Sequence, residues 1–288
     1  MRRSLVPLLL LLAVVAGGCG RDGSTSQAPA AAKRIVSMSP TATEMLFAIG
    51  AGPQVVAADS NSNYPKEAPK TDLSAYQPNL EAIAGYKPDL VVYSDDPGEL
   101  AAGLSKLAIP ALAEPAAKSL DDTYAQIDQL GRATGHPADA ARLTATMRAE
   151  VAKIVAAGRP ERPLTYYHEL DKNLYSATSR TFIGQLYGLL GMENIADAAD
   201  KDKSGYPQLS AEYVVKADPD LIFLADTKCC AQSARTVAAR DGWDRLTAVK
   251  SGGVVELDDD IASRWGPRVV DFLKTISAKV QTLEAVGS

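Results

Sequence analysis

The chain has 288 residues, of which 30 are lysine or arginine and 35 are aspartate or glutamate. This length is enough for one large α/β body or for two lobes. The mildly acidic balance and the lack of any basic run in the sequence argue against a nucleic acid as the partner.

The first 19 residues have the order of features of a secretory leader. Met1–Arg3 carries positive charge, Leu5–Ala16 is an apolar run too short to span a membrane comfortably, and small residues precede Cys19. This order resembles a bacterial lipoprotein signal, whose cysteine is acylated; the alternative is an ordinary secretory signal that contains a cysteine. We predict a signal peptide over residues 1–19 that ends at an acylated Cys19, which anchors an extracytoplasmic protein to the cell membrane.

Residues 20–32 are small and polar, contain proline and glycine, and show no apolar periodicity. This composition predicts a flexible tether. When Arg2 and Arg3 leave with the leader, 28 basic and 35 acidic residues remain, which is a net charge of −7.

From Arg34 onward, short apolar runs alternate with helical patterns. Pro40 follows Ser39 at a helix start, and Gly50 and Gly52 end that helix. The βαβα order predicts a mostly parallel sheet. The predicted strands are residues 34–38, 55–59, 90–94 and 111–114, and the predicted helices are residues 41–49 and 79–85.

A long helical stretch then divides the chain. Residues 120–134 read as a helix, Gly135–Pro137 breaks it, and residues 138–157 run uninterrupted with one apolar face. Alternation resumes with strands at 164–169, 194–196, 221–225 and 254–257 and helices at 182–190 and 267–283. We therefore predict two Rossmann-like α/β lobes, residues 33–137 and 159–288, joined by one bridging helix over residues 138–158.

The two halves share a spacing. Glu81 stands seven residues before Pro88-Asp89-Leu90, and Glu212 stands seven residues before Pro219-Asp220-Leu221. Pro-Asp is a common turn before a strand, but turn chemistry does not require a glutamate at one offset in both halves. The spacing indicates an internal duplication or a shared docking role.

Catalytic motifs are absent from the sequence, which contains no G-x-S-x-G, no H-E-x-x-H and no P-loop. The two histidines lie far apart in sequence: His136 is read as a capping or surface residue, and His168 as a buried strand residue or one that faces a cleft. We predict a binding protein rather than an enzyme.

The segments that follow the predicted strands are rich in tyrosine, amides, hydroxyls and carboxylates. Ligands of α/β folds gather at the carboxyl ends of parallel strands, and such side chains suit a large, flat, partly polar ligand. These segments are residues 39–43, 59–64, 74–77 and 93–96 in the first half, and 169–175, 204–206, 226–230 and 260–265 in the second.

Cys229 and Cys230 are adjacent and belong to an oxidising compartment if the leader is read correctly. We favour a vicinal disulfide between them. Free thiols and a soft metal site are the alternatives, and no third metal ligand stands nearby in the sequence.

Taken in order, several segments resemble the Fe/B12-type periplasmic binding proteins of ABC importers, above all the vitamin B12 binding proteins. The resemblance covers essentially the whole chain from Lys33. It rests on Arg34–Glu44, Asn63-Tyr64-Pro65, Pro78–Glu81, Lys87–Val91 and Gly191–Ile195.

The resemblance implies two α/β lobes bridged by a rigid helix, with a ligand in the cleft between them. It also implies that Glu81 and Glu212, one on each lobe, dock on arginines of a permease dimer that a cytoplasmic ATPase drives. The protein is then expected to act as a monomer, to need no cofactor and to use no protein metal ligands.

The resemblance places the ligand-binding residues at eight positions. Tyr175 and Tyr206 match second-lobe pocket aromatics, and Arg264 lies in the equivalent loop beside Trp265. In the first lobe Asn61 stands where an aromatic is expected before Tyr64, and Tyr76 and Tyr93 stand beside expected tryptophan positions. The expected ligand is a corrinoid, with a ferric siderophore or haem as alternatives; a lipid-anchored enzyme or an adhesion or signalling lipoprotein is a different, disfavoured class.

Overall fold

The computed structural model describes residues 31–287, so Cys19, the signal peptide and nearly all of the predicted tether lie outside the described residues. Ala32 belongs to the folded body, because it is buried and its backbone N–H donates to the carbonyl of Ala133 at 2.9 Å. The predicted tether included residues 31 and 32, but these two residues pack against the end of α4 (Leu120–Thr134) in the first lobe.

The first lobe is built on a parallel sheet in the order β2-β1-β3-β4. The central strand β1 is buried at all four positions, as expected for a parallel strand covered on both faces. The strands are β1 (Ile35–Met38), β2 (Val55–Ala58), β3 (Leu90–Tyr93) and β4 (Ala111–Ala113).

Helices cover both faces of this sheet, and the alternation of strand side chains decides which core each residue joins. Ile35 and Val92 pack with the inner helices, whereas Val36 and Val91 pack with the outer ones. The inner helices are α1 (Pro40–Ala48) and α4 (Leu120–Thr134), and the outer ones are α2 (Leu80–Gly85) and α3 (Leu100–Lys106).

The second lobe repeats this topology in the order β6-β5-β7-β8, again with every pair parallel. Its strands are β5 (Thr165–Glu169), β6 (Glu193–Asn194), β7 (Leu221–Leu224) and β8 (Val254–Glu256). Its helices are α6 (Phe182–Leu189), α7 (Ala211–Ala217), α8 (Thr227–Cys230), α9 (Ala234–Ala238), α10 (Thr247–Lys250), α11 (Asp259–Ala262) and α12 (Val269–Gly287). The predicted α/β class with parallel sheets is confirmed.

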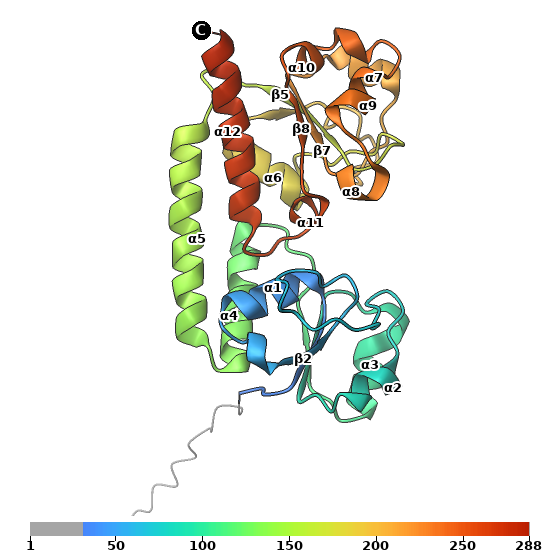
Figure 1. The fold of residues 1–288 in the computed structure, drawn as a ribbon, viewed down its shortest axis with the longest axis vertical. Helices are drawn as coiled ribbons and strands as arrows, with labels where there is room; N and C mark the ends of the chain where they lie inside the picture. The colour runs from blue at the N-terminus through green and yellow to red at the C-terminus, as the bar shows by residue number, and fades with distance from the viewer. Residues whose placement is uncertain (1–30, 288) are drawn as a thin grey trace, which may run out of the picture. The chain divides into compact units, whose positions relative to one another are not determined.

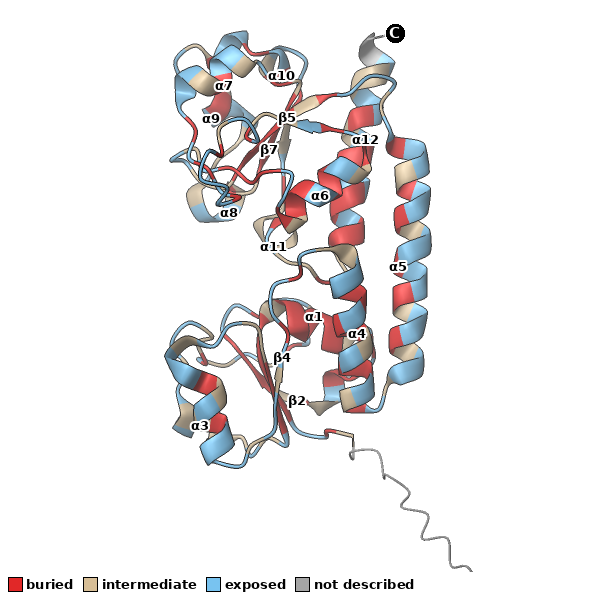
Figure 2. Ribbon diagram, turned by 180° about the vertical axis from the view of Figure 1, so that it is seen from behind, coloured by how far each residue is buried: buried red, intermediate tan, exposed pale blue. Residues whose placement is uncertain are grey.

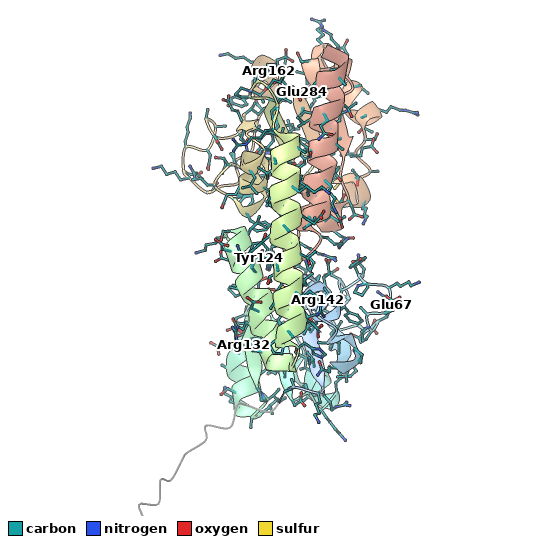
Figure 3. All side chains as sticks on the ribbon, turned by 90° about the vertical axis from the view of Figure 1, so that its left-hand side faces the viewer. Glu67, Tyr124, Arg132, Arg142, Arg162 and Glu284 are labelled. Carbon is teal, nitrogen blue, oxygen red and sulfur yellow. The ribbon has the colours of Figure 1, made fainter. Side chains whose placement is uncertain are left out.

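The long helix α5 (Pro137–Gly158) runs along α4 of the first lobe and α12 of the second (Figure 1). Its buried positions form a stripe on one side, visible in Figure 2. In Figure 3, Arg142 lies in the part of α5 next to the first lobe. At the opposite end of α5, the figure labels Arg162, which follows the helix, and Glu284 of α12. The helix predicted over residues 138–157 is therefore present and extends slightly at both ends.

One apolar core runs through both lobes. It joins Ile35 of β1 and Leu130 of α4 to Met147 and Ile154 of α5, and continues to Phe223 of β7 and the inner face of α12. Residues from Ala31 onward accordingly form one compact unit. This shared layer packs both lobes against the same helices, α4, α5 and α12.

Within residues 31–287, every helix is too short or too polar to cross a membrane.

Candidate functional site: the cleft between the lobes

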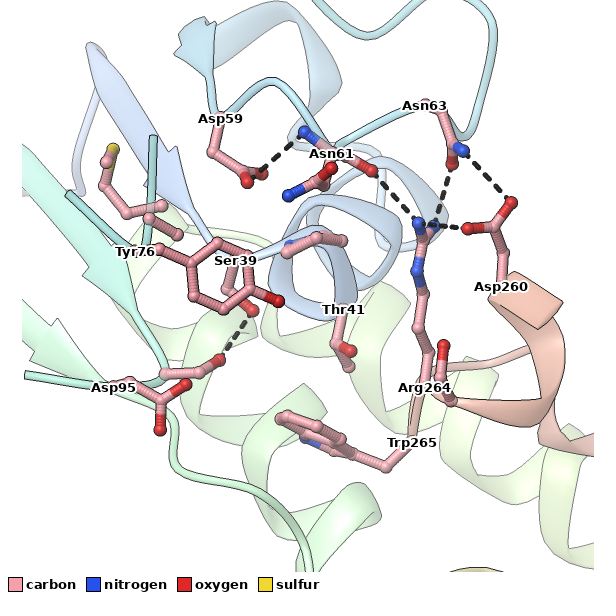
Figure 4. Close-up of a pocket in the computed structure, with 15 residues that line it drawn as sticks. Ser39, Thr41, Asp59, Asn61, Asn63, Tyr76, Asp95, Asp260, Arg264 and Trp265 are labelled. Carbon is pink, nitrogen blue, oxygen red and sulfur yellow. Dashed lines mark hydrogen bonds and ion pairs between the residues drawn. The ribbon is translucent and has the colours of Figure 1, made fainter. Parts of the chain in front are cut away.

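The carboxyl ends of both sheets face a cleft that residues of both lobes line. On the first-lobe side lies a cavity of about 410 Å³, shown in Figure 4. Its walls come mainly from the segments after β1, β2 and β3 and from the segment before α12. They include Ser39, Thr41, Asp59, Asn61, Asn63, Tyr76, Ser94, Asp95, Asp260, Arg264 and Trp265.

A second cavity of about 690 Å³ lies on the second-lobe side. It shares Ser263, Arg264 and Trp265 with the first, so the two are halves of one cleft. Its other walls include Ala116, Ala117, Lys118, Leu170, Arg180–Ile183, Lys203–Tyr206, Ala225 and Ala262.

Hydroxyl groups organise the end of the first sheet. The Ser94 hydroxyl donates to Ser39 Oγ at 2.6 Å, and Ser39 in turn caps α1 by accepting from the Ala42 N–H at 3.2 Å. Burial raises the pKa of Asp59, although the Ser62 hydroxyl donates to its carboxylate at 2.5 Å and opposes that rise. This wall is therefore polar and held in place by its own hydrogen bonds.

Ion pairs join the two lobes at the base of the cleft. Glu44 of α1 is buried, and its carboxylate accepts from Arg264 at 2.8 Å and from Arg268 at 2.9 and 2.5 Å. Arg264 also donates to Asn63 Oδ1 at 3.0 Å, to the Asn61 carbonyl at 3.0 Å and to Asp260 at 2.8 Å. Its guanidinium thus holds the lobes together, which limits its ability to bind a ligand directly.

Five of the eight predicted ligand-binding residues line the cleft. Asn61 and Tyr76 lie in the first cavity and Tyr206 in the second, while Arg264 and Trp265 line both. The Trp265 indole N–H donates to Gln126 Oε1 at 2.9 Å, which holds the ring between the cavities.

The other three predicted residues, all tyrosines, do not line either cavity. The Tyr64 ring lies under the Arg268 guanidinium, 4.2 Å from its centre, and so supports the inter-lobe ion pairs. Tyr93 packs into the outer core of the first lobe, because strand alternation turns it away while its neighbour Ser94 faces the cavity. Tyr175 pairs with Gln208 in an isolated β-bridge of the second lobe.

Lys228, which lies in the segment that follows β7, is already neutralised by two carboxylates. Its ammonium group donates to Asp258 and Asp260, each at 2.8 Å, and these hydrogen bonds raise its pKa.

Cys229 and Cys230 are free thiols in the structure, in contrast to the predicted vicinal disulfide. Both lie in the single-turn helix α8, whose backbone N–H groups at Lys228 and Cys229 donate to the Asp259 carboxylate at 2.9 and 3.0 Å. The two thiols interact without a covalent bond: a hydrogen bond with Cys230 is the largest cause of the rise in the pKa of the Cys229 thiol.

The histidines take the structural roles that the sequence favours. His168 is fully buried in β5, and burial lowers its pKa to about 4. Its Nδ1 lies 2.9 Å from the Tyr187 hydroxyl. His136 stands at the start of α5, 3.5 Å from an Asp139 carboxylate oxygen.

The repeated Pro-Asp turns have a shared structural role. Asp89 accepts from the backbone N–H of Arg34 at 2.8 Å, just before β1, and Asp220 accepts from that of Thr165 at 2.8 Å, where β5 begins. Each aspartate therefore ties the start of the third strand of its lobe to the start of the first. This equivalence, with the identical strand order, supports an internal duplication.

Glu81 and Glu212 also occupy equivalent places. Each is the second residue of a short helix, α2 or α7, behind a capping residue: Asn79 accepts from Ala82 N–H at 3.0 Å, and Ser210 from Tyr213 N–H at 3.1 Å. Both glutamates are exposed. The helices that carry them, α2 and α7, lie on the side of their lobes away from α5 (Figure 1).

Sequence reasoning missed the basic residues of the second cavity and the partners of the inter-lobe ion pairs. Lys118 and Arg180 stand outside every segment expected at a strand end, and Lys203 precedes one directly. Glu44 lies inside a predicted helix and Arg268 in the predicted final helix, and nothing in the sequence indicates that these two residues pair.

Among residues 31–287, no group of three or more histidine, cysteine, aspartate or glutamate side chains is placed to hold a metal ion.

Comparison with known proteins agrees with this architecture. A family model described as periplasmic binding protein matches residues 35–261. An uncharacterized ABC transporter substrate-binding lipoprotein of Bacillus subtilis, YvrC, is 27% identical over 312 residues that cover 97% of this chain and 97% of that protein. A cobalamin-binding protein of Halobacterium salinarum is 32% identical over 249 residues, which cover 83% of this chain and 67% of that protein.

A solved structure shares the whole fold. The periplasmic vitamin B12 binding protein BtuF of Vibrio cholerae is similar with a TM-score of 0.71 and 25% sequence identity, over 88% of this chain and 98% of that one. The match of the family model over most of the chain, the cleft between two duplicated lobes and these relatives lead to one conclusion: the chain belongs to the periplasmic binding protein family.

Proposed function

We propose that the protein is the extracytoplasmic binding component of an ABC importer, which captures a corrinoid and delivers it to a permease. The observation that carries the proposal is the cleft itself, which both lobes line at the carboxyl ends of their sheets. The similarity of the chain to a protein named cobalamin-binding protein supports a corrinoid as the ligand. The role is binding and not catalysis.

The chemistry of the cleft suits a large, partly polar chelate. Tyr76 and Tyr206 are 77% and 53% exposed, and with Trp265 they offer three aromatic faces along the cleft. Aromatic rings contribute large contact areas at low entropic cost, and their polar ends still accept or donate hydrogen bonds. Cavities of about 410 and 690 Å³ that share a wall are of the size that holds a drug-sized or larger ligand.

Titration of the purified protein with cyanocobalamin, haemin and ferric siderophores tests the proposal. We expect cyanocobalamin to bind in a calorimetric titration and to quench tryptophan fluorescence. Saturable binding of haemin or a ferric siderophore alone would replace the corrinoid by that alternative, and a failure of every chelate to bind would contradict the proposed function.

The two tryptophans of the chain provide an internal control for this titration. Trp265 lines the cleft, whereas Trp243 is buried in the second-lobe core. We expect the Trp265→Phe variant to lose most of the fluorescence response and the Trp243→Phe variant to keep it. The reverse pattern would place the ligand away from the cleft.

We further propose that Glu81 and Glu212 dock on cationic side chains of the permease. Both carboxylates are exposed, one on each lobe, at equivalent helix starts. The Glu212 carboxylate accepts a hydrogen bond from its own backbone N–H and another from Ser210, and these lower its pKa, so it is ionised at neutral pH. The core shared by the two lobes supports docking of both glutamates at a nearly constant spacing before and after ligand capture.

Lipid attachment at Cys19 completes the proposal and has its own test. In a Cys19→Ser variant expressed in a bacterial host, we expect the protein to move from the membrane fraction to the soluble extracytoplasmic fraction, because no acyl chain would hold it on the bilayer. Fractionation and immunoblotting measure this. A variant that stays with the membrane after a salt wash would contradict lipid anchoring.

A further inference from the structure

The two halves of the cleft differ in charge. Asp59, Asp95 and Asp260 line the first cavity, and Arg264 is the one cation on its described walls. The second cavity has the opposite character, because Lys118, Arg180, Lys203 and Arg264 line it and no described aspartate or glutamate does. The cleft therefore changes from acidic to basic across the segment Ser263–Trp265.

Two of the four cations in the second cavity are already committed. Arg180 forms an ion pair with the buried Asp200, and Arg264 is bound to Glu44 and Asp260. Lys118 and Lys203 have no ion pair within residues 31–287, and both side chains are exposed. Lys118 belongs to the first lobe and Lys203 to the second. The packing of the two lobes therefore brings these two positive charges to one cavity.

Other parts of the second cavity also favour binding of an anionic group. Its wall includes Thr181, Phe182 and Ile183 at the N-terminal end of α6, where the helix dipole adds positive potential beside the two lysines. The opposite cavity disfavours an anion, because Asp95 has no ion pair within the described part of the chain and Asp59 is a buried acceptor. A ligand with one anionic group would thus be oriented by charge.

We propose that the ligand carries an anionic oxygen group, which binds in the second cavity between Lys118 and Lys203, while its hydrogen-bond donors face Asp59 and Asp95. This inference rests on the proposed function and makes it more specific: the bound corrinoid is a complete one, whose nucleotide loop contains a phosphodiester and whose side-chain carboxamides are the donors. Recognition would then favour cobalamin over cobinamide, which lacks the nucleotide loop and its phosphate.

The test compares paired ligands on paired variants. We expect wild-type protein to bind cyanocobalamin more tightly than dicyanocobinamide. In the Lys118→Gln/Lys203→Gln variant, we expect the affinity for cyanocobalamin to fall about tenfold to a hundredfold, as for the loss of hydrogen bonds to a charged group. The affinity for dicyanocobinamide should change by less than about twofold. Raising the salt concentration should weaken only cyanocobalamin binding by the wild type.

A Lys106→Gln/Lys153→Gln variant is the matched control. It removes the same charge from exposed lysines on α3 and α5 that line neither cavity, so its affinities should remain at the wild-type values. Two further ligand pairs test the other sources of an anionic group. Haemin, which carries carboxylates, is compared with its dimethyl ester, and an anionic ferric tricatecholate is compared with a neutral ferric hydroxamate. If the double variant folds poorly, the salt dependence of binding by the wild-type protein still tests whether a charged contact holds the ligand.

The outcomes separate the two proposals. Equal affinity of the anionic and neutral members of every pair, or equal losses for both in the lysine variant, would overturn the charged-ligand inference and leave chelate binding in place. A selective loss within the haemin or tricatecholate pair alone would retain the anion site and overturn the assignment to a corrinoid phosphodiester. If no chelate binds, the proposed function fails and this inference fails with it.

Discussion

Replacing Glu44 by glutamine is expected to lower the free energy of unfolding by about 3–5 kcal/mol, the usual cost of breaking a buried ion pair by removing one partner. The Glu44 side chain is 1% exposed, and those of Arg264 and Arg268 are 9% and 14% exposed. Arg268 forms no other ion pair within the described residues, so the substitution removes the carboxylate that contacts this nearly buried guanidinium and leaves only the more distant charges of Asp258 and Asp260. Urea unfolding at neutral pH, followed by circular dichroism, measures the change.

Glu150 provides the comparison for this experiment. It pairs with Lys274 at 3.6 Å and links α5 to α12, but the two side chains are 38% and 52% exposed. Glu150→Gln is therefore expected to change stability by less than about 1 kcal/mol. If Glu44→Gln were as mild as Glu150→Gln, the ion pairs at the base of the cleft would not be what joins the lobes there.

Reversing the charge of both exposed glutamates, Glu81→Arg/Glu212→Arg, is expected to reduce ligand uptake by cells to the background of a strain that lacks the protein. Two cation–carboxylate contacts with the permease would become repulsive, and like-charge contacts at an interface cost several kcal/mol. Each single reversal should leave partial uptake. The affinity for ligand in solution should stay within about twofold of wild type, because neither residue lines the cleft.

The control for charge reversal is Glu67→Arg/Glu193→Arg. These exposed glutamates also lie one on each lobe, and their reversal changes the net charge by the same amount. Arginine near a helix start costs about 0.3–1 kcal/mol through the helix dipole, so thermal melts must show that the docking variant remains folded. Unchanged uptake by a folded docking variant, or equal loss in the control, would contradict the docking role.

Much of the fold could be predicted from local patterns. The uninterrupted apolar face of residues 138–157 and the short apolar runs between turns predict the bridging helix and the eight strands, because side-chain periodicity reflects which face of an element is buried. Helices α3, α8, α9, α10 and α11 were not predicted. They are short and covered on one side only, so their periodic signal is weak.

The candidate site was predicted in part. Polar segments after strands lead to Asn61, Tyr76, Tyr206 and Trp265, since parallel strands bring those segments to one edge of a sheet. The expected segment 93–96 contains both Tyr93, which packs into the outer core of the first lobe, and Ser94, which lines the cavity, and the sequence did not show which of the two faces the cleft. It also could not show that Asp258 and Asp260 neutralise Lys228.

The sequence by itself determined the α/β order of both halves, the helix between them and the equal offset of Glu81 and Glu212 from a Pro-Asp turn, because periodicity and turn residues depend on neighbours within a few positions. Only the tertiary structure decided which charges remain available to a ligand. Glu44 forms ion pairs with Arg264 and Arg268, more than two hundred positions away in the sequence, so these arginines are already neutralised. Lys118 and Lys203 come from opposite lobes and line one cavity, and neither has an ion pair within residues 31–287. Charge pairing depends on distances of a few ångströms, and the packing of the lobes against one shared core sets those distances.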